Sequence, residues 1–206
     1  MTLVVNFLAG SGCGKSSLAW DVSAELKWMG GINVEYVQEF VKHHLYEGRM
    51  SIFKDQDYIF GKQKYSIKRL VDCGKLDVIV TDSPILLSAY YNTIFAIKNN
   101  LSIDENFNKN VLNNFNKFNN LNYFLERIKP FNEIGRFQTA EEARQDDIKL
   151  RKMLDNFGVK YTVIKGEKQS TEIIANQIKN IVNAQKQGKA KKLNKIIKGE
   201  HHDTTI

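Results

Sequence analysis

The chain has 206 residues, of which 42% are hydrophobic, and its 30 basic side chains against 23 acidic ones give a net charge of +7. This length suits one domain with its own core, and the hydrophobic fraction excludes a disordered chain. No apolar run approaches the roughly 20 residues that cross a bilayer, and two cysteines are too few for a disulfide framework. We therefore expect a soluble, cytoplasmic protein with no membrane partner.

The positive charge is concentrated at the C-terminal end. Residues 173–206 contain seven lysines and two acidic residues, so the rest of the chain is nearly neutral. This shift predicts a main domain at residues 1–184 and a basic tail at residues 185–206. A lysine-rich tail can bind the phosphates of a nucleic acid. More often, such a segment is only a solvated helix or a frayed end. The sequence gives no indication of the oligomeric state.

Apolar and amphipathic segments alternate along the chain. Short apolar runs predict strands at residues 3–8, 32–37, 76–81, 121–125 and 159–164. Apolar residues at helical spacing predict helices at residues 15–29, 38–47, 55–71, 84–97, 104–117, 140–157 and 171–186. Strands that alternate with helices of this length indicate an α/β domain with a central, five-stranded parallel sheet.

Asparagine is strongly over-represented between Asn99 and Asn122, where it occupies 11 of 24 positions. Because asparagine is a poor helix former, the stretch is either a surface insertion or a bias of composition. We favour the bias of composition.

A glycine-rich segment lies between the first predicted strand and the first predicted helix. It comprises Ala9, Gly10, Ser11, Gly12, Cys13, Gly14, Lys15, Ser16 and Ser17. The spacing fits a phosphate-binding P-loop, in which backbone N–H groups and a helix N-terminus surround phosphate oxygens; the one departure is Ala9 at the first glycine position. We predict that this segment binds ATP, with Lys15 at the β- and γ-phosphates and Ser16 holding Mg²⁺.

Two carboxylates follow predicted strands. Asp82 comes directly after the third strand, where ligands of open α/β sheets collect, and it is predicted to hold Mg²⁺ through its water shell or to act in catalysis. The alternative is a helix cap before Pro84. Glu39 follows the second strand and could accept a proton from the phosphoryl acceptor. A first-turn glutamate favoured by the helix dipole explains Glu39 equally well.

Basic residues gather on a Gly- and Pro-containing segment after the fourth strand. They are Arg127, Lys129, Arg136 and Arg144. We interpret the segment as a lid that brings guanidinium charge onto a transferring phosphoryl group, with Arg127 and Arg136 as the catalytic candidates. The alternative is a basic loop that forms surface ion pairs of little energetic value.

The motifs resemble those of phage and bacterial P-loop ATPase and kinase proteins, which are distantly similar to nicotinamide riboside kinases and other nucleoside or nucleotide kinases. The resemblance covers about residues 2–165 and depends on the P-loop, on Glu39-Phe40, on Thr81-Asp82-Ser83-Pro84 and on Gly135-Arg136. It implies the P-loop NTPase fold and a kinase activity, but does not identify the acceptor.

We therefore expect a Mg·ATP-dependent phosphotransferase whose acceptor is a nucleoside, a nucleotide or a related small molecule. A second hypothesis keeps the chemistry and makes the acceptor a modified base or an end within DNA or RNA, bound with the help of the basic tail. A third is an ATPase or nucleotide-binding module without an acceptor. A guanine-specific GTPase is disfavoured, because Asn116-Lys117-Phe118-Asn119 ends in the wrong residue for pairing with guanine.

Overall fold

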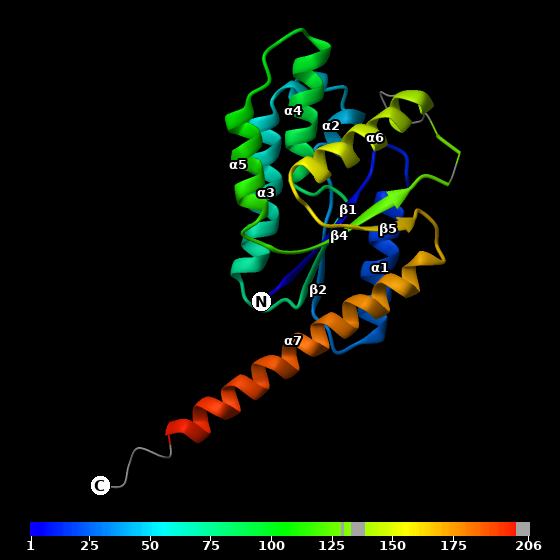
Figure 1. The fold of residues 1–206 in the computed structure, drawn as a ribbon. Coiled ribbons are helices and arrows are strands. Elements are labelled where there is room, and N and C mark those ends of the chain that lie inside the picture. The colour runs from blue at the N-terminus through cyan, green and yellow to red at the C-terminus, as the bar shows by residue number, and fades with distance from the viewer. Residues whose placement is uncertain (129, 133–138, 201–206) are drawn as a thin grey trace.

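A five-stranded, all-parallel sheet forms the centre of the molecule (Figure 1). The computed structural model describes residues 1–128, 130–132 and 139–200. Across the sheet the strands follow the order β2 (Val34–Val37), β3 (Val78–Thr81), β1 (Leu3–Leu8), β4 (Asn119–Glu126) and β5 (Thr162–Lys165). The predicted α/β class and the number and order of strands along the chain are confirmed.

Helices cover both faces of the sheet. One face is covered by α1 (Lys15–Met29) and α7 (Ser170–Glu200), and the other by α3 (Gln56–Asp72), α4 (Leu86–Lys98), α5 (Glu105–Phe115) and α6 (Ala140–Asn156). The side chains of β1 alternate between the two cores: Leu3, Val5 and Phe7 face α1 and α7, whereas Val4 and Leu8 face the other layer. This burial on both faces explains why every side chain of β1 except Asn6 is apolar.

Two helical segments differ from the predictions. The helix expected at residues 38–47 is reduced to α2 (Lys42–Tyr46), and a short 3₁₀ helix, η1 (Met50–Lys54), follows it. At the other end of the chain, α7 continues to Glu200 and does not end near residue 186. The predicted domain boundary at residue 184 thus falls inside one continuous helix, whose last part leaves the body of the molecule (Figure 1). Lysine is the commonest residue in this part, and it favours helix.

The asparagine-rich stretch belongs to the fold, because it includes α5 and the first half of β4. On neighbouring strands, the buried amide of Asn6 donates to the side-chain oxygens of Asn122 at 2.9 Å and Asn120 at 3.0 Å. Asn122 in turn donates to the carbonyl oxygen of Lys160 at 2.9 Å. The stretch is therefore not a surface insertion, and the amides of Asn6, Asn120 and Asn122 are bonded to one another and to backbone carbonyls.

Within the described part of the chain, no helix combines the length and the apolar character that crossing a membrane requires.

Candidate active site

The glycine-rich segment forms the turn between the carboxyl end of β1 and the first turn of α1. Gly12 and Gly14 have φ angles of 76° and 95°, a left-handed conformation that glycine adopts without strain. Among the described residues, no side chain caps the start of α1, and its first turn holds no acidic residue. The N–H groups and the positive end of the helix dipole are therefore available to an anion at this point.

The ammonium group of Lys15 folds back over the loop. Its Nζ atom donates to the carbonyl oxygens of Ala9 and Gly10, both at 2.8 Å. Burial lowers the pKa of Lys15 from its ordinary value, and nearby charges oppose that shift, first that of Glu39 and, among others, that of Asp82. The structure thus brings both sequence-predicted carboxylates within electrostatic reach of the P-loop lysine.

Asp82 directly follows β3 and is only 4% exposed. Its Oδ1 atom is buried, and no described residue donates a hydrogen bond to it. The N-cap position of α4 belongs to Ile85, so Asp82 does not cap that helix. Because a buried carboxylate oxygen without a partner is costly, this atom suits a cation or an ordered water that the protein alone does not supply.

Tyr36 lies beside Asp82 and was not singled out from the sequence. Burial raises the pKa of the Tyr36 phenol, and the charge of Asp82 raises it further. The Tyr36 hydroxyl, like Asp82 Oδ1, is a buried oxygen to which no described residue is assigned as a hydrogen-bond partner. Two adjacent oxygens of this kind fit a hydrated cation.

A magnesium ion here would depend on few protein ligands. The described residues contain no group of three or more His, Cys, Asp or Glu side chains arranged for a metal. Ser16 is the second residue of α1, and Asp82 lies at the end of the adjacent strand β3. This sparse set fits Mg²⁺, which keeps several waters and is usually held by one or two protein oxygens together with phosphates.

Glu39 lies two residues beyond the end of β2. The buried side chain of Gln63 fixes the backbone on both sides of it, accepting from the N–H of Phe40 at 3.2 Å and donating to the carbonyl of Gln38 at 3.4 Å. Among the charges near Lys15, that of Glu39 raises the lysine pKa most. It also adds to the effect of burial in raising the pKa of Tyr91. Glu39 therefore approaches the site from the β2 side.

Arg127, the first residue after β4, binds helix α6. Its Nε atom donates to Asp147 Oδ2 at 2.9 Å, and Nη2 donates to the carbonyl of Ala143 at 3.3 Å. The other oxygen of Asp147 accepts the N–H of Gly10 in the P-loop at 2.6 Å. Nη1 is buried, and no described residue accepts a hydrogen bond from it. One guanidinium nitrogen is thus left to bind a ligand.

Neighbouring backbone and side chains pack closely on the loop. A β-carbon on Gly12 would lie 2.8 Å from the ring of Phe131, and the guanidinium of Arg127 lies 5.9 Å from the centre of the same ring. The thiol of Cys13 points inward and donates to the carbonyl of Leu125 at 3.3 Å. Burial raises the Cys13 pKa to about 11, which leaves the thiol protonated and unreactive at neutral pH.

Of the predicted catalytic residues, the structure gathers Lys15, Glu39, Asp82 and Arg127 around the P-loop. Arg136 and Lys129 lie outside the described residues. Arg144 is exposed and pairs with Glu141 at 3.4 Å, as expected for a surface ion pair.

Sequence reasoning missed Tyr36, Asp147 and also Gly166, on which a β-carbon would lie 2.4 Å from the carbonyl oxygen of Cys13 in the loop. The signal for Tyr36 was its place near the carboxyl end of a predicted strand. Asp147 lies on a helix with many charged residues, where one half-buried carboxylate has no distinguishing pattern.

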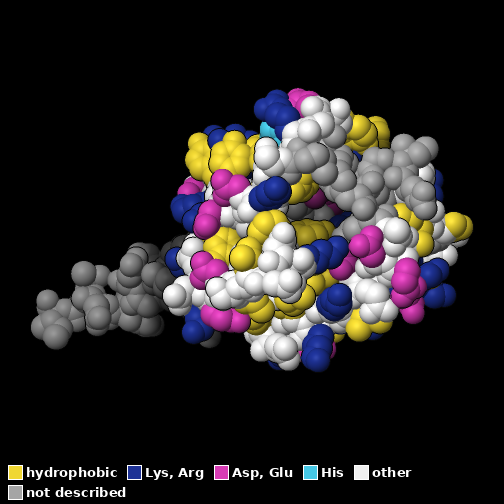
Figure 2. All heavy atoms as spheres, turned by 90° about the horizontal axis from the view of Figure 1, so that it is seen from above, with side chains coloured by type: hydrophobic (Ala, Val, Ile, Leu, Met, Phe, Trp, Pro, Cys, Tyr) yellow, Lys and Arg dark blue, Asp and Glu magenta, His cyan; other side chains and the backbone are white. Residues whose placement is uncertain are grey.

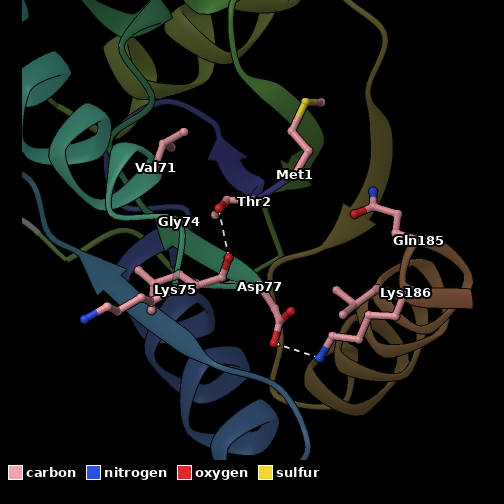
Figure 3. A pocket seen from close by; sticks show the side chains of 10 residues that line it. Met1, Thr2, Val71, Gly74, Lys75, Asp77, Gln185 and Lys186 are labelled. Atoms are coloured by element: carbon pink, nitrogen blue, oxygen red, sulfur yellow. Dashed lines mark hydrogen bonds and ion pairs between the residues drawn. The ribbon is translucent and has the colours of Figure 1, made fainter. Parts of the chain in front are cut away.

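The site lies on the face to which the carboxyl ends of the strands point. Seen from above, this face is hollowed near its middle, and acidic and basic side chains lie around the hollow (Figure 2). A second hollow lies at the opposite edge, where Thr2 and Asp77 precede β1 and β3 (Figure 3). In it Lys186 pairs with Asp77 at 2.9 Å. It is remote from the P-loop and takes no part in the site.

No protein-family model matches the chain, and no curated protein sequence matches it significantly. Solved structures share its fold. The NadR protein in complex with NR superimposes with a TM-score of 0.59 at 14% identity over 85% of this chain, which spans only about half (51%) of that protein. Deoxyadenosine kinase from M. mycoides, with the products dCMP and dCDP bound, gives 0.56 at 17% identity over 88% of this chain and all of the kinase. Its complex with dATP gives 0.52 at 17% identity over 87% of this chain, again matching the whole kinase. The chain therefore has an α/β P-loop fold, which it shares with these solved structures.

Proposed function

We propose that the protein is a Mg·ATP-dependent phosphotransferase that moves the γ-phosphoryl group of ATP to a hydroxyl group of a nucleoside, a nucleotide or a related small molecule. The observation that carries the proposal is the cluster around Lys15: an uncapped helix start and a lysine in a glycine-rich turn, with Glu39 and Asp82 close to it. The fold shared with deoxyadenosine kinase supports the same chemistry.

The P-loop would hold the triphosphate. In this proposal the backbone N–H groups of the loop and the first turn of α1 donate to phosphate oxygens, and Lys15 exchanges its contacts to Ala9 and Gly10 for the β- and γ-phosphates. Ser16 and Asp82 would hold Mg²⁺. When bound, the ion neutralises charge on the phosphate oxygens. The unpartnered Oδ1 atom of Asp82 is the structural reason for this assignment.

Glu39 would act on the acceptor. Glu39 follows β2 and Arg127 follows β4, and these two strands lie on opposite sides of β1, which leads into the P-loop. The acceptor oxygen attacks the γ-phosphorus, the bond from that phosphorus to the β,γ-bridging oxygen breaks, and ADP leaves. Glu39 takes the proton of the attacking hydroxyl, either in the transition state or just after it. The products are ADP and the phosphorylated acceptor.

Arg127 would stabilise the transferring group. Negative charge sits on the equatorial oxygens of a loose phosphoryl-transfer transition state, where a guanidinium is most effective. Nη1 of Arg127 is buried and unpartnered among the described residues, and it faces Gly12 of the loop. Arg136 stays a proposal from the sequence, as a second guanidinium in the same role. Its replacement by alanine should lower kcat by about 10² to 10⁴ and change the KM for ATP much less.

The test is a search for the acceptor. Nucleosides, nucleoside monophosphates and oligonucleotides are first screened by the rise in melting temperature that they cause together with Mg²⁺ and a non-hydrolysable ATP analogue. Acceptors that bind are then incubated with ATP, and ADP and the phosphorylated product are quantified. We expect equal amounts of both with a small-molecule acceptor. Equal ADP release with and without every acceptor would instead identify an ATPase.

The nucleic-acid alternative makes a different prediction. Affinity for a polyanion falls steeply as salt concentration rises, whereas affinity for a small nucleoside changes little. Stoichiometric phosphorylation of an oligonucleotide with a steep salt dependence, and none of a free nucleoside, would replace the small-molecule proposal.

A further inference from the structure

We infer that Asp147 is a positioning residue that aims Arg127 at the phosphates and ties helix α6 to the P-loop. This inference rests on the proposed function. It assigns a role to a residue that is neither in the glycine-rich segment nor among the basic residues of the lid.

The first observation is that one carboxylate joins two parts of the site. Asp147 Oδ1 accepts the N–H of Gly10 at 2.6 Å, and Oδ2 accepts Nε–H of Arg127 at 2.9 Å. The side chains of this ion pair are 12% exposed for Arg127 and 16% exposed for Asp147. A charge-assisted pair with so little solvent contact holds its geometry far better than a surface ion pair.

The second observation is that α6 packs directly on the loop. A β-carbon on Gly10 would lie 2.7 Å from the carbonyl oxygen of Ala143 and 2.8 Å from Asp147 Oδ1. Ala143 and Asp147 are four residues apart, so they share one face of the helix. Only glycine at position 10 allows this approach. The contact fixes the distance between α6 and the start of the P-loop.

The third observation is that two nitrogens of the Arg127 guanidinium bind α6, while the remaining nitrogen points to the P-loop. Nε and Nη2 of Arg127 both bind α6, through Asp147 and the Ala143 carbonyl. Nη1 lies on the side of Gly12, 3.4 Å from where a β-carbon on that residue would be. Because the guanidinium is planar and rigid, fixing two of its nitrogens sets the direction of the third. Asp147 thereby directs Nη1 toward the loop.

Replacement of Asp147 by asparagine isolates this role. Asparagine keeps the shape, but one of its two ends is an N–H₂ donor. Whichever way the amide is turned, it places a donor against either the Gly10 N–H or the Arg127 Nε–H. A hydrogen bond to a charged group is lost, which corresponds to about 10- to 100-fold in a rate or binding constant. We expect kcat to fall by that factor, while the KM for ATP changes less than about threefold because most phosphate contacts come from the P-loop.

The decisive test is a double-mutant cycle of Asp147→Asn and Arg127→Ala. Two quantities are measured for each protein: kcat, and the Kd of a non-hydrolysable ATP analogue in the presence of Mg²⁺. In the wild-type background, Asp147→Asn should lower kcat by about 10- to 100-fold and weaken binding of the analogue by a smaller factor, up to about threefold. In the Arg127→Ala background, the carboxylate of Asp147 has lost its cation and repels the phosphates. There, Asp147→Asn should leave binding unchanged or tighten it. Asp155→Asn, a change of the same kind on α6 at a residue that bonds Tyr161, is the control and should match the wild type.

The opposite results would overturn the inference. If Asp147→Asn reduces binding and kcat by the same factor in both backgrounds, Asp147 does not act through Arg127. The inference also fails if Asp147→Asn has the same kcat and the same Kd for the analogue as the wild type. Should Asp147→Asn fail to fold, Asp147→Glu keeps the charge and displaces it by one methylene, and the same cycle is measured with it. A wild type that binds the analogue but phosphorylates no acceptor would refute the proposed function, while the binding cycle would still test Asp147.

Discussion

Gly166 presses its backbone against Cys13 of the P-loop. Gly166 follows β5, its N–H donates to the carbonyl of Glu126 at 3.0 Å, and a β-carbon on it would lie 2.4 Å from the carbonyl oxygen of Cys13. The two oxygens nearest to that β-carbon, the carbonyls of Cys13 and Glu126, belong to the backbone, so they cannot rotate away as a side chain can. The strand at the edge of the sheet therefore supports the loop that begins α1.

Replacing Gly166 by alanine should displace the P-loop. We expect a loss of stability of about 1–3 kcal/mol from the overpacked contact and at least tenfold weaker binding of Mg·ATP analogues. Thermal unfolding and calorimetric titration measure the two effects. Gly61→Ala is the matched control, because a β-carbon on Gly61 of α3 would meet nothing within 4 Å and alanine favours a helix. Nucleotide binding by Gly166→Ala at wild-type strength would mean that β5 does not support the loop.

Asp82→Asn should slow phosphoryl transfer by about 10² or more and raise the Mg²⁺ concentration needed for half-maximal rate. The substitution keeps the shape of the side chain and removes the charge beside Lys15. Turnover is measured across a magnesium titration. Asp77→Asn is the control, since Asp77 precedes β3 at its other end and pairs with Lys186. If Asp82→Asn stays within about threefold of the wild type at every magnesium concentration, Asp82 has no metal role.

Nucleotide binding should take up protons at alkaline pH. Burial lowers the pKa of Lys15 from 10.5, and phosphate charge favours the protonated form, so binding raises that pKa again. Between the two values the free protein holds fewer protons than the complex, and affinity falls as pH rises through the lowered pKa. In the same window the unfolded chain binds more protons than the folded one, so the stability of the unliganded protein rises with pH.

Calorimetric titrations at a series of alkaline pH values below 10.5, in two buffers of different ionisation enthalpy, measure this proton uptake. The wild type should take up protons on binding ADP or an ATP analogue, and Lys15→Ala should not. Equal uptake by both proteins would assign the effect to another group.

Removal of the end of α7 should leave nucleotide binding unchanged. Lys186 Nζ bonds the carbonyl of Gly31 at 3.1 Å and Asp77 at 2.9 Å, at the edge of the sheet opposite the P-loop. A chain ending at Ala184 loses this half-exposed contact, at a cost of about 0–1 kcal/mol, whereas a chain ending at Gly188 keeps it. Loss of ATP binding in the chain ending at Gly188 would contradict this expectation. Weaker oligonucleotide binding with a flatter salt dependence would support the nucleic-acid alternative.

The elements of the fold could be predicted because their patterns are local. The apolar run of β1, the glycines before Lys15 and the helical spacing in α1 each act within a few residues. Glu39 and Asp82 could be placed at the site because both follow parallel strands, whose carboxyl ends meet at one edge.

The residues that were missed depend on long-range packing. Asp147 contacts Gly10 across 137 positions of sequence, and Gly166 is close to Cys13 only because β5 joins the sheet beside β4. Neither contact leaves a local pattern. The end of α7 was placed too early because a run of lysines fits a frayed tail and a solvated helix equally well.

The central claim is that Lys15 belongs to a phosphoryl-transfer site, and it is tested most directly by Lys15→Ala with the acceptor found in the screen. Product formation and melting temperature are measured on the same preparations. Because the side chain of Lys15 is only partly buried and bonds two loop carbonyls, we expect the variant to fold with a melting temperature within a few degrees of the wild type. Phosphorylated product should be undetectable, a loss of at least about 10³-fold. Product formation by the folded variant at a rate close to that of the wild type would contradict the account.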